Sequence, residues 1–271
     1  MFLYYNNNLI DDEAVTINPS CQGFQFGLGV FETILVLEGK PCFMELHFER
    51  LMQGCKKLGL QLVLEAEQLK AQAQALISRN NIKNGRLKLL CFRDIKGIST
   101  LITVSDYDYK ENFCEEGYDI CLSEIRRNPH SPMPYIKSLN YGENILTRER
   151  AINQGYQEAL FMNVYDRLCE GTISNIFWIK DNIVFTPEIS CGILNGITRS
   201  QVIQLCRNLK LELHEGSYKY EELLEAEEVF ITNSLIDIMP ISKVENYFYN
   251  ISDYKITRKL YAEYKNLIKH S

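Results

Sequence analysis

The sequence predicts an α+β protein with two domains. Segments whose apolar residues recur at helical spacing alternate with short runs of β-branched and apolar residues, as in helices packed with strands. The stretch 129–134 contains three prolines in six residues, which excludes a helix or a central strand there. We therefore expect a small α+β domain over residues 1–117, an interdomain strand and proline-rich connection over 118–134, and a larger, strand-rich domain over 135–271.

The first part begins with a small hairpin at residues 2–10 that turns at three consecutive asparagines. Next, Gly27 and Gly29 indicate a backbone that turns sharply or is closely approached. Because β-branched residues follow them, and no third glycine opens a helix, a dinucleotide-binding fingerprint is excluded. Further along we expect a hairpin of strands at 30–37 and 41–44, helices at 45–58 and 65–79, and strands at 86–92 and 100–105.

The second part is predicted to hold several strands between three helices. Ile176–Ile179 and Ile183–Phe185 should pair through a turn at Asp181-Asn182. The other strands are expected at 118–125, 160–164 and 228–232, and the helices at 144–156, 198–208 and 254–268.

The composition narrows the class of protein. With 271 residues, 46% hydrophobic and 24% charged, the chain is an ordinary globular one. A net charge of −6 argues against nucleic acid or an anionic membrane as the main partner. We find no signal-peptide pattern, and the nine cysteines are odd in number without C-x-x-C spacing, which favours free, mostly buried thiols in a reducing cytoplasm. The four histidines are scattered, so no metal site is expected.

Lys137 is a candidate nucleophile. It lies near Ile136 and Leu139, and a lysine in apolar surroundings has its pKa lowered by desolvation, so that its neutral amine can attack an aldehyde. Taken alone, a solvated surface lysine is the commoner interpretation.

Three further features could hold a ring that bears a phosphate. Glu170 follows a turn and precedes an apolar strand, where a carboxylate could face a pyridine nitrogen; the alternative is an exposed turn residue. Gly196-Ile197-Thr198 offers N–H groups and a hydroxyl to a phosphate, or an ordinary helix cap. Arg50 and Arg93 offer two-pronged donors for a phosphate and a carboxylate, or form surface ion pairs.

Several ordered motifs cover nearly the whole chain. They are Q-F-G-L-G-V-F-E-T (25–33), H-F-E-R-L (47–51), I-K-S-L-N-Y (136–141), E-G-T-I-S-N-I-F (170–177), T-P (186–187), G-I-L-N-G-I-T-R (192–199) and V-F-I-T-N-S (229–234). Together they resemble the class IV aminotransferases, pyridoxal phosphate enzymes of fold type IV. The resemblance implies a small α+β domain, a larger domain with a barrel-like sheet, bound pyridoxal 5′-phosphate and a homodimer.

The resemblance also implies roles for individual residues. Lys137 would form an aldimine with the cofactor and then move protons. Glu170 would contact the pyridine nitrogen, and Tyr141 would lie near the ring hydroxyl. The other implied contacts are Arg50, Ile197, Thr198 and Ser234 for the phosphate, and Arg93 and Asn233 for the substrate.

Within the family, the chain is most similar to the 4-amino-4-deoxychorismate lyases of folate biosynthesis, which release pyruvate and 4-aminobenzoate. Arg127-Asn128-Pro129-His130 and Asn233, followed by Met239-Pro240, carry that similarity. The stretches 137–141 and 170–172 fit aminotransferases equally well, so a branched-chain or D-amino acid aminotransferase is the alternative. A cofactor-binding protein without turnover is a third possibility. The roles of the two histidines stay open: the position of His47 on a predicted helix favours a structural role, and the position of His130 near Lys137 leaves room for a substrate-side role.

Overall fold

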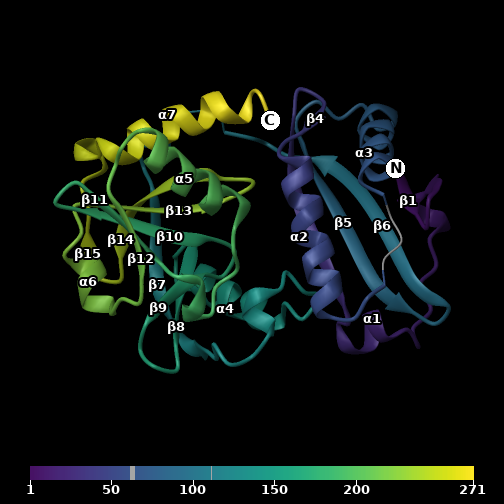
Figure 1. Ribbon diagram of the computed structural model, residues 1–271, viewed down its shortest axis with the longest axis horizontal. Coiled ribbons are helices and arrows are strands. Elements are labelled where there is room, and N and C mark those ends of the chain that lie inside the picture. The colour runs from purple at the N-terminus through teal and green to yellow at the C-terminus, as the bar shows by residue number, and fades with distance from the viewer. Residues whose placement is uncertain (62–64, 111) are drawn as a thin grey trace. The chain divides into compact units, whose positions relative to one another are not determined.

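The computed structural model describes residues 1–61, 65–110 and 112–271, whose contacts form two compact units (Figure 1). The first unit comprises Met1–Tyr109, Ile136–Asn140 and Ile268–Ser271, and the second comprises Lys110–Tyr135 and Tyr141–Leu267. This division places the lysine stretch with the first unit, because Ile136–Asn140 runs along a strand of that unit.

The first unit is built on an antiparallel sheet of six strands, counted over the described residues, in the order β2-β1-β6-β5-β3-β4. The strands are β1 (Phe2–Tyr5), β2 (Asn8–Asp11), β3 (Gly29–Leu37), β4 (Lys40–Pro41), β5 (Gly85–Asp94) and β6 (Gly97–Asp106). The helices are α1 (Gln22–Phe26), α2 (Met44–Lys57) and α3 (Ala66–Arg79), with a short 3-10 turn at Asp12–Ala14. Helix α2 packs on β3, and α3 packs on β1 and β6.

Most elements predicted for the first unit are confirmed. In β5 the leucines Leu87 and Leu89 are buried and the alternating basic residues Arg86 and Lys88 are exposed, as expected for a strand with one face on a core. For the predicted hairpin at 30–37 and 41–44, the range expected for the second strand is wrong. The strand covers only Lys40–Pro41, and Met44 already belongs to α2, since Phe43 in the left-handed conformation begins the helix there.

The sharp turn and the close backbone approach predicted at Gly27 and Gly29 are also present. Gly27 has a φ of +64°, and a Cβ on Gly29 would lie 2.6 Å from Leu139 Cδ1 and 2.7 Å from the Cys91 carbonyl oxygen. The backbone is therefore approached closely at Gly29 by the segment that carries Lys137.

The second unit contains a mixed sheet of nine strands among the described residues. The order is β12-β11-β10-β13-β14-β7-β8-β9, and β15 pairs with β14. The strands are β7 (Tyr118–Arg127), β8 (Glu158–Asn163), β9 (Leu168–Gly171), β10 (Asn175–Lys180), β11 (Ile183–Pro187), β12 (Leu213–Gly216), β13 (Glu228–Asn233), β14 (Asp237–Val244) and β15 (Tyr247–Phe248). The helices are α4 (Gly142–Asn153), α5 (Ile197–Asn208), α6 (Tyr220–Leu224) and α7 (Ile256–Ile268), and 3-10 turns lie at Met133–Tyr135, Ile189–Cys191 and Ile251–Asp253.

This larger sheet curls toward a half barrel. Strand β9, at one end of the order, contacts β10 and β11 near the other end. Three strand pairs are parallel, namely β11 with β12, β14 with β7, and β7 with β8. The expectation of a barrel-like sheet is confirmed.

Local sequence explains the strands that surround the site. All six residues of β8 are buried, and five of six are buried in β10 and in β13, so these strands are covered on both faces. The predicted hairpin of β10 and β11 is confirmed: Asp181 and Asn182 both have positive φ, the geometry of a tight two-residue turn. Strands β9, β12, β14 and β15 were not predicted.

All nine cysteines are free, and eight are buried, as predicted. In the part of the chain that the structure describes, no helix combines the length and the apolar character needed to cross a membrane.

Candidate active site

Lys137 lies on a segment that runs antiparallel to the start of β3. The Lys137 carbonyl accepts a hydrogen bond from Phe31 N at 2.9 Å, and Leu139 N donates to the Gly29 carbonyl at 2.9 Å. Its Nζ atom lies 4.5 Å from the centroid of the Phe31 ring. Ile136, the preceding residue, is buried. An aromatic ring therefore lies beside the Lys137 amine, and the residue that precedes the lysine in the chain is buried.

Arg50, predicted to hold a phosphate, is bound to a buried acid that the sequence did not single out. Its Nε and Nη2 atoms donate to Glu32 Oε1 and Oε2 at 2.8 and 2.6 Å. His47 Nδ1 lies 2.7 Å from the same Oε2. The structural role expected for His47 therefore has a physical basis: it shares the carboxylate that orients Arg50.

The electrostatics of this cluster are well defined. Burial by itself would raise the pKa of Glu32, but the charge and hydrogen bonds of Arg50, with the hydrogen bond from His47, outweigh it and lower the pKa to about 2. Burial lowers the pKa of His47, against the opposing effect of Glu32. Lys137 adds a small lowering through its charge, so lysine, arginine and histidine lie near one another in the first unit.

Arg93, predicted to bind the substrate, contacts a backbone carbonyl instead of the Glu32 carboxylate that binds Arg50. It ends the regular part of β5, and its Nη2 atom donates to the Gly59 carbonyl at 2.8 Å. Its backbone N–H donates to the Leu28 carbonyl at 2.9 Å. The structure therefore joins Arg93 to the turn after α2 rather than to the Glu32 cluster.

Glu170, in the second unit, lies in strand β9 and is only 7% exposed, so the alternative of an exposed turn residue is excluded. Its Oε2 atom accepts hydrogen bonds from Leu194 N at 2.9 Å and from Asn175 Nδ2 at 3.3 Å. The Nη2 atom of Arg127 lies 3.9 Å from Oε1. A buried carboxylate with these partners is oriented before any ligand binds.

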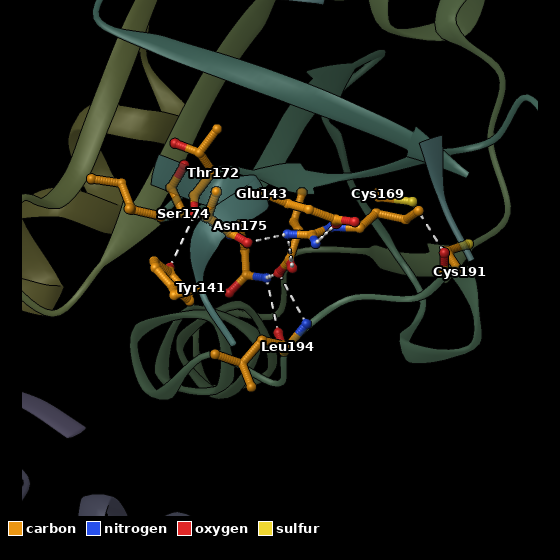
Figure 2. Close-up of polar contacts among 12 residues, drawn as sticks. Tyr141, Glu143, Cys169, Thr172, Ser174, Asn175, Cys191 and Leu194 are labelled. Carbon is orange, nitrogen blue, oxygen red and sulfur yellow. Dashed lines mark hydrogen bonds and ion pairs between the residues drawn. The ribbon is translucent and has the colours of Figure 1, made fainter. Parts of the chain in front are cut away.

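Tyr141 is connected to the chain just beyond Glu170. Its hydroxyl donates to the Thr172 carbonyl at 3.0 Å, and Asn144 Nδ2 donates to the same carbonyl at 2.5 Å (Figure 2). Glu170 and Tyr141, two of the residues predicted to face a cofactor ring, are therefore brought together through Thr172.

The turn that follows Glu170 is fixed by a second buried acid, Glu158. Its carboxylate accepts hydrogen bonds from Thr172 N at 3.0 Å, from the Thr172 hydroxyl, from Ile173 N at 3.2 Å and from the Ser174 hydroxyl at 2.9 Å. A Cβ at Gly171 would lie 2.2 Å from Ser174 Oγ, so only glycine fits there. The turn between β9 and β10 is thus rigid and closely packed.

The predicted phosphate cradle is the N-terminus of α5. Gly196, the residue before the helix, has no side chain to cap it, and the first turn has no acidic residue. A Cβ at Gly196 would lie 2.1 Å from Asn175 Oδ1. Ile197 and Thr198 open the helix, and the Thr198 hydroxyl lies 3.2 Å from the Tyr264 hydroxyl. The uncapped N–H groups of such a turn attract an anion.

Asn233 is the last residue of β13, and Ser234 follows it. Asn233 Oδ1 accepts hydrogen bonds from Leu235 N at 2.8 Å and Ile236 N at 3.0 Å, so this side chain shapes the turn into β14. His130, in the proline-rich connection, has its Nε2 atom 2.5 Å from the Tyr165 hydroxyl. Asn233, Ser234 and His130 all lie in the second unit with Glu170.

Sequence reasoning assigned no role to Glu32, Arg127, Asn144 or Glu158. One signal was available for Glu158, since a glutamate opens the otherwise apolar run of β8. Arg127 belonged to the Arg127-Asn128-Pro129-His130 motif that carries the similarity to the lyases, but the motif assigned it no contact. Among the described residues, no group of His, Cys, Asp and Glu side chains could hold a metal ion.

The donor set fits pyridoxal phosphate. An uncapped helix N-terminus with Gly196 at its head suits a phosphate, and a buried carboxylate in the same unit, Glu170, suits a pyridinium nitrogen. The family comparison supports this chemistry: residues 29–244 match the family model described as amino-transferase class IV.

Relatives and solved structures match over nearly the whole length. The chain is 30% identical to the aminodeoxychorismate lyase of Bacillus subtilis, over 99% of this chain and 95% of that protein. It is 29% identical to a D-alanine aminotransferase of Staphylococcus epidermidis, over 98% of each. A Legionella pneumophila structure provisionally described as a 4-amino-4-deoxychorismate lyase matches with a TM-score of 0.87 and 28% identity, over 95% of this chain and 97% of that one.

The Escherichia coli branched-chain amino acid aminotransferase has the same fold, with a TM-score of 0.91 over 98% of this chain and 94% of that one, at 23% identity. The fold and the matched residues define a pyridoxal phosphate-dependent enzyme. The chain belongs to the class IV aminotransferase family.

Proposed function

We propose that this enzyme is a 4-amino-4-deoxychorismate lyase. The observation that carries the proposal is the 30% identity to the Bacillus subtilis aminodeoxychorismate lyase, sustained over 99% of the chain. The likeness to the Legionella pneumophila structure supports it. The reaction splits one substrate into 4-aminobenzoate and pyruvate, so it needs no second substrate and no net change of the cofactor.

In this proposal Lys137 holds the cofactor and moves protons. Bound pyridoxal phosphate supplies an electron sink for the carbon that loses a proton. The Lys137 amine, which lies beside the Phe31 ring, takes the proton from the substrate carbon that bears the amino group. The enolpyruvyl group then leaves, and its protonation gives pyruvate.

Other residues bind and orient. Glu170 faces the pyridine nitrogen and Tyr141 the ring hydroxyl. The first turn of α5 and Arg50 hold the phosphate, together with Ser234, while Arg93 and Asn233 contact the substrate's carboxylates. The hydrogen bonds of Glu170 and Arg50 support these roles: Glu170 accepts from Leu194 N, and Arg50 donates to the buried Glu32, so each side chain is oriented before a ligand arrives.

A D-amino acid aminotransferase is the second candidate, favoured by 29% identity to the Staphylococcus epidermidis enzyme over 98% of both chains. The early proton transfer by Lys137 would be the same in that case. The difference lies in where the proton goes next: in an aminotransferase Lys137 returns it to the cofactor, and an oxo acid leaves. A branched-chain amino acid would be the third substrate class to compare.

A cytoplasmic homodimer completes the proposal. Helix α4 leaves the apolar side chains of Ile145, Leu146 and Ile152 about half exposed, at 52, 55 and 49%, and a second copy could cover them. Sedimentation of the cofactor-loaded protein tests this part independently of the reaction.

The test of the reaction is a product assay. Purified, cofactor-loaded protein receives enzymatically prepared 4-amino-4-deoxychorismate, and pyruvate and 4-aminobenzoate are followed. Parallel samples receive D-alanine or branched-chain L-amino acids, and the absorbance of the cofactor is followed. Equal amounts of pyruvate and 4-aminobenzoate support the lyase; conversion of the cofactor to its amine form by an amino acid, without those products, supports the aminotransferase.

A further inference from the structure

Arg127, at the end of β7, lies against the acid that we assign to the pyridine nitrogen. Its Nη2 atom is 3.9 Å from Glu170 Oε1, and each side chain is only 9% exposed. The guanidinium also lies over the Phe161 ring, 4.0 Å from its centroid. Because solvent screens such a buried pair little, the arginine favours the ionised form of Glu170.

Asn144 holds the guanidinium in place and extends its connections. Arg127 Nη2 donates to Asn144 Oδ1 at 3.0 Å, and Asn144 Nδ2 donates to the Thr172 carbonyl. The Tyr141 hydroxyl donates to that same carbonyl (Figure 2). A continuous path of polar contacts thus joins Glu170 to Tyr141, the residues proposed for the two polar positions of the ring.

Other titratable groups in this region act less directly on Glu170. Glu143 Oε2 accepts from Arg127 Nη1 at 3.2 Å, but its side chain is 63% exposed and screened by water. Glu158 is occupied by the donors of the turn at 172–174. Burial raises the pKa of the neighbouring Cys169 thiol, so that thiol stays neutral.

We propose that Arg127 is a positioning residue that keeps Glu170 ionised and directed at the pyridine nitrogen. The inference rests on the proposed role of Glu170. An ionised Glu170 stabilises a proton on that nitrogen, whereas a neutral carboxyl group would not, and the protonated ring is the better electron sink. Arg127 therefore acts on the reaction through Glu170 without touching the substrate.

The test uses protein loaded with pyridoxal phosphate labelled with nitrogen-15 in the ring, whose resonance reports whether the nitrogen carries a proton. Arg127→Met removes the charge, and Arg127→Lys retains it. Arg150→Met, at an exposed arginine of α4, is the matched control. Glu170→Gln tests the role of Glu170 itself. Thermal unfolding of each protein without cofactor shows whether it is folded.

We expect Arg127→Met to move the resonance toward the unprotonated position and to lower kcat/KM by about tenfold or more, with KM changed less than about threefold. Arg127→Lys should stay close to the protonated position, and Arg150→Met should match the natural protein. If Arg127→Met does not fold, Asn144→Ala, which releases the guanidinium, should give a smaller shift in the same direction.

Two results would overturn the inference. One refutes only the role of Arg127, and the other also refutes the proposed role of Glu170. If Glu170→Gln loses the protonated signal while Arg127→Met or Asn144→Ala retains it, Arg127 does not position Glu170, although the role of Glu170 stands. If Glu170→Gln itself retains the signal, both the inference and the proposed site are wrong.

Discussion

Glu32 and Arg50 form a two-pronged ion pair in which both carboxylate oxygens accept from one guanidinium, at 2.8 and 2.6 Å. This pair predicts how stability depends on pH. The pKa of Glu32 is lowered to about 2 in the folded protein, from an ordinary value of 4.5. A lowered pKa in the folded state means that the stabilisation is complete above 4.5 and is lost as pH falls from 4.5 toward 2.

The size of this effect is about 3 kcal/mol at pH 7, falling by about half at pH 3. We therefore expect Glu32→Gln to lower the free energy of unfolding by about that amount at pH 7, as measured in urea. Glu45→Gln is the control: Glu45 also pairs with a cation, Lys70, at 2.7 Å, but its side chain is 65% exposed, so its loss should cost less than about 0.5 kcal/mol. Equal losses in the two variants would contradict the account.

His47 predicts a separate effect nearer neutrality. Burial lowers its pKa below the ordinary value of 6.5, so the unfolded chain takes up a proton first as the pH falls. Stability should therefore decline as the pH drops below 6.5. His47→Gln should flatten this decline between pH 6.5 and about 5, whereas substitution of the exposed His270 should not. An unchanged slope in the His47 variant would show that folding does not lower the pKa of this histidine.

The turn after Glu170 predicts a sharp contrast between two glycines. Gly171→Ala places a Cβ 2.2 Å from Ser174 Oγ and 2.9 Å from Glu158 Oε2, whereas nothing lies within 4 Å of a Cβ at Gly142. We expect Gly171→Ala to cost about 1–3 kcal/mol of unfolding free energy and to weaken cofactor retention on dialysis. Gly142→Ala, at the start of α4, should be neutral or stabilising by up to about 1 kcal/mol. Similar results for both variants would mean that the turn adapts.

The elements that sequence predicted well are those with a strong local pattern. Helices α2, α3, α5 and α7 follow their apolar periodicity to within two residues of the expected bounds. Strand β9 has only four residues, and β12 pairs in parallel with β11. Parallel partners are distant in sequence, so a local pattern gives little sign of them.

The residues of the candidate site also fall into a group that the sequence revealed and a group that it did not. Lys137, Glu170 and the start of α5 were recognisable because each belongs to a continuous motif. The partners of those residues were not, since Arg127 meets Glu170 across 43 positions and Glu32 meets Arg50 only after β3 and α2 have packed. The roles of the motif residues stay predictions, and the buried partners explain why those side chains are held in place.

The most direct test of the central claim is to find which lysine carries the cofactor. Borohydride reduction of the loaded protein fixes the cofactor to that lysine, and peptide mapping by mass spectrometry locates it. Lys88 is the internal comparison, because burial lowers its pKa and so makes its neutral amine more available. We predict that Lys137 carries the modification and that no lysine of the Lys137→Ala variant carries it. Modification of Lys88 or another lysine, with Lys137 unmodified, would contradict it.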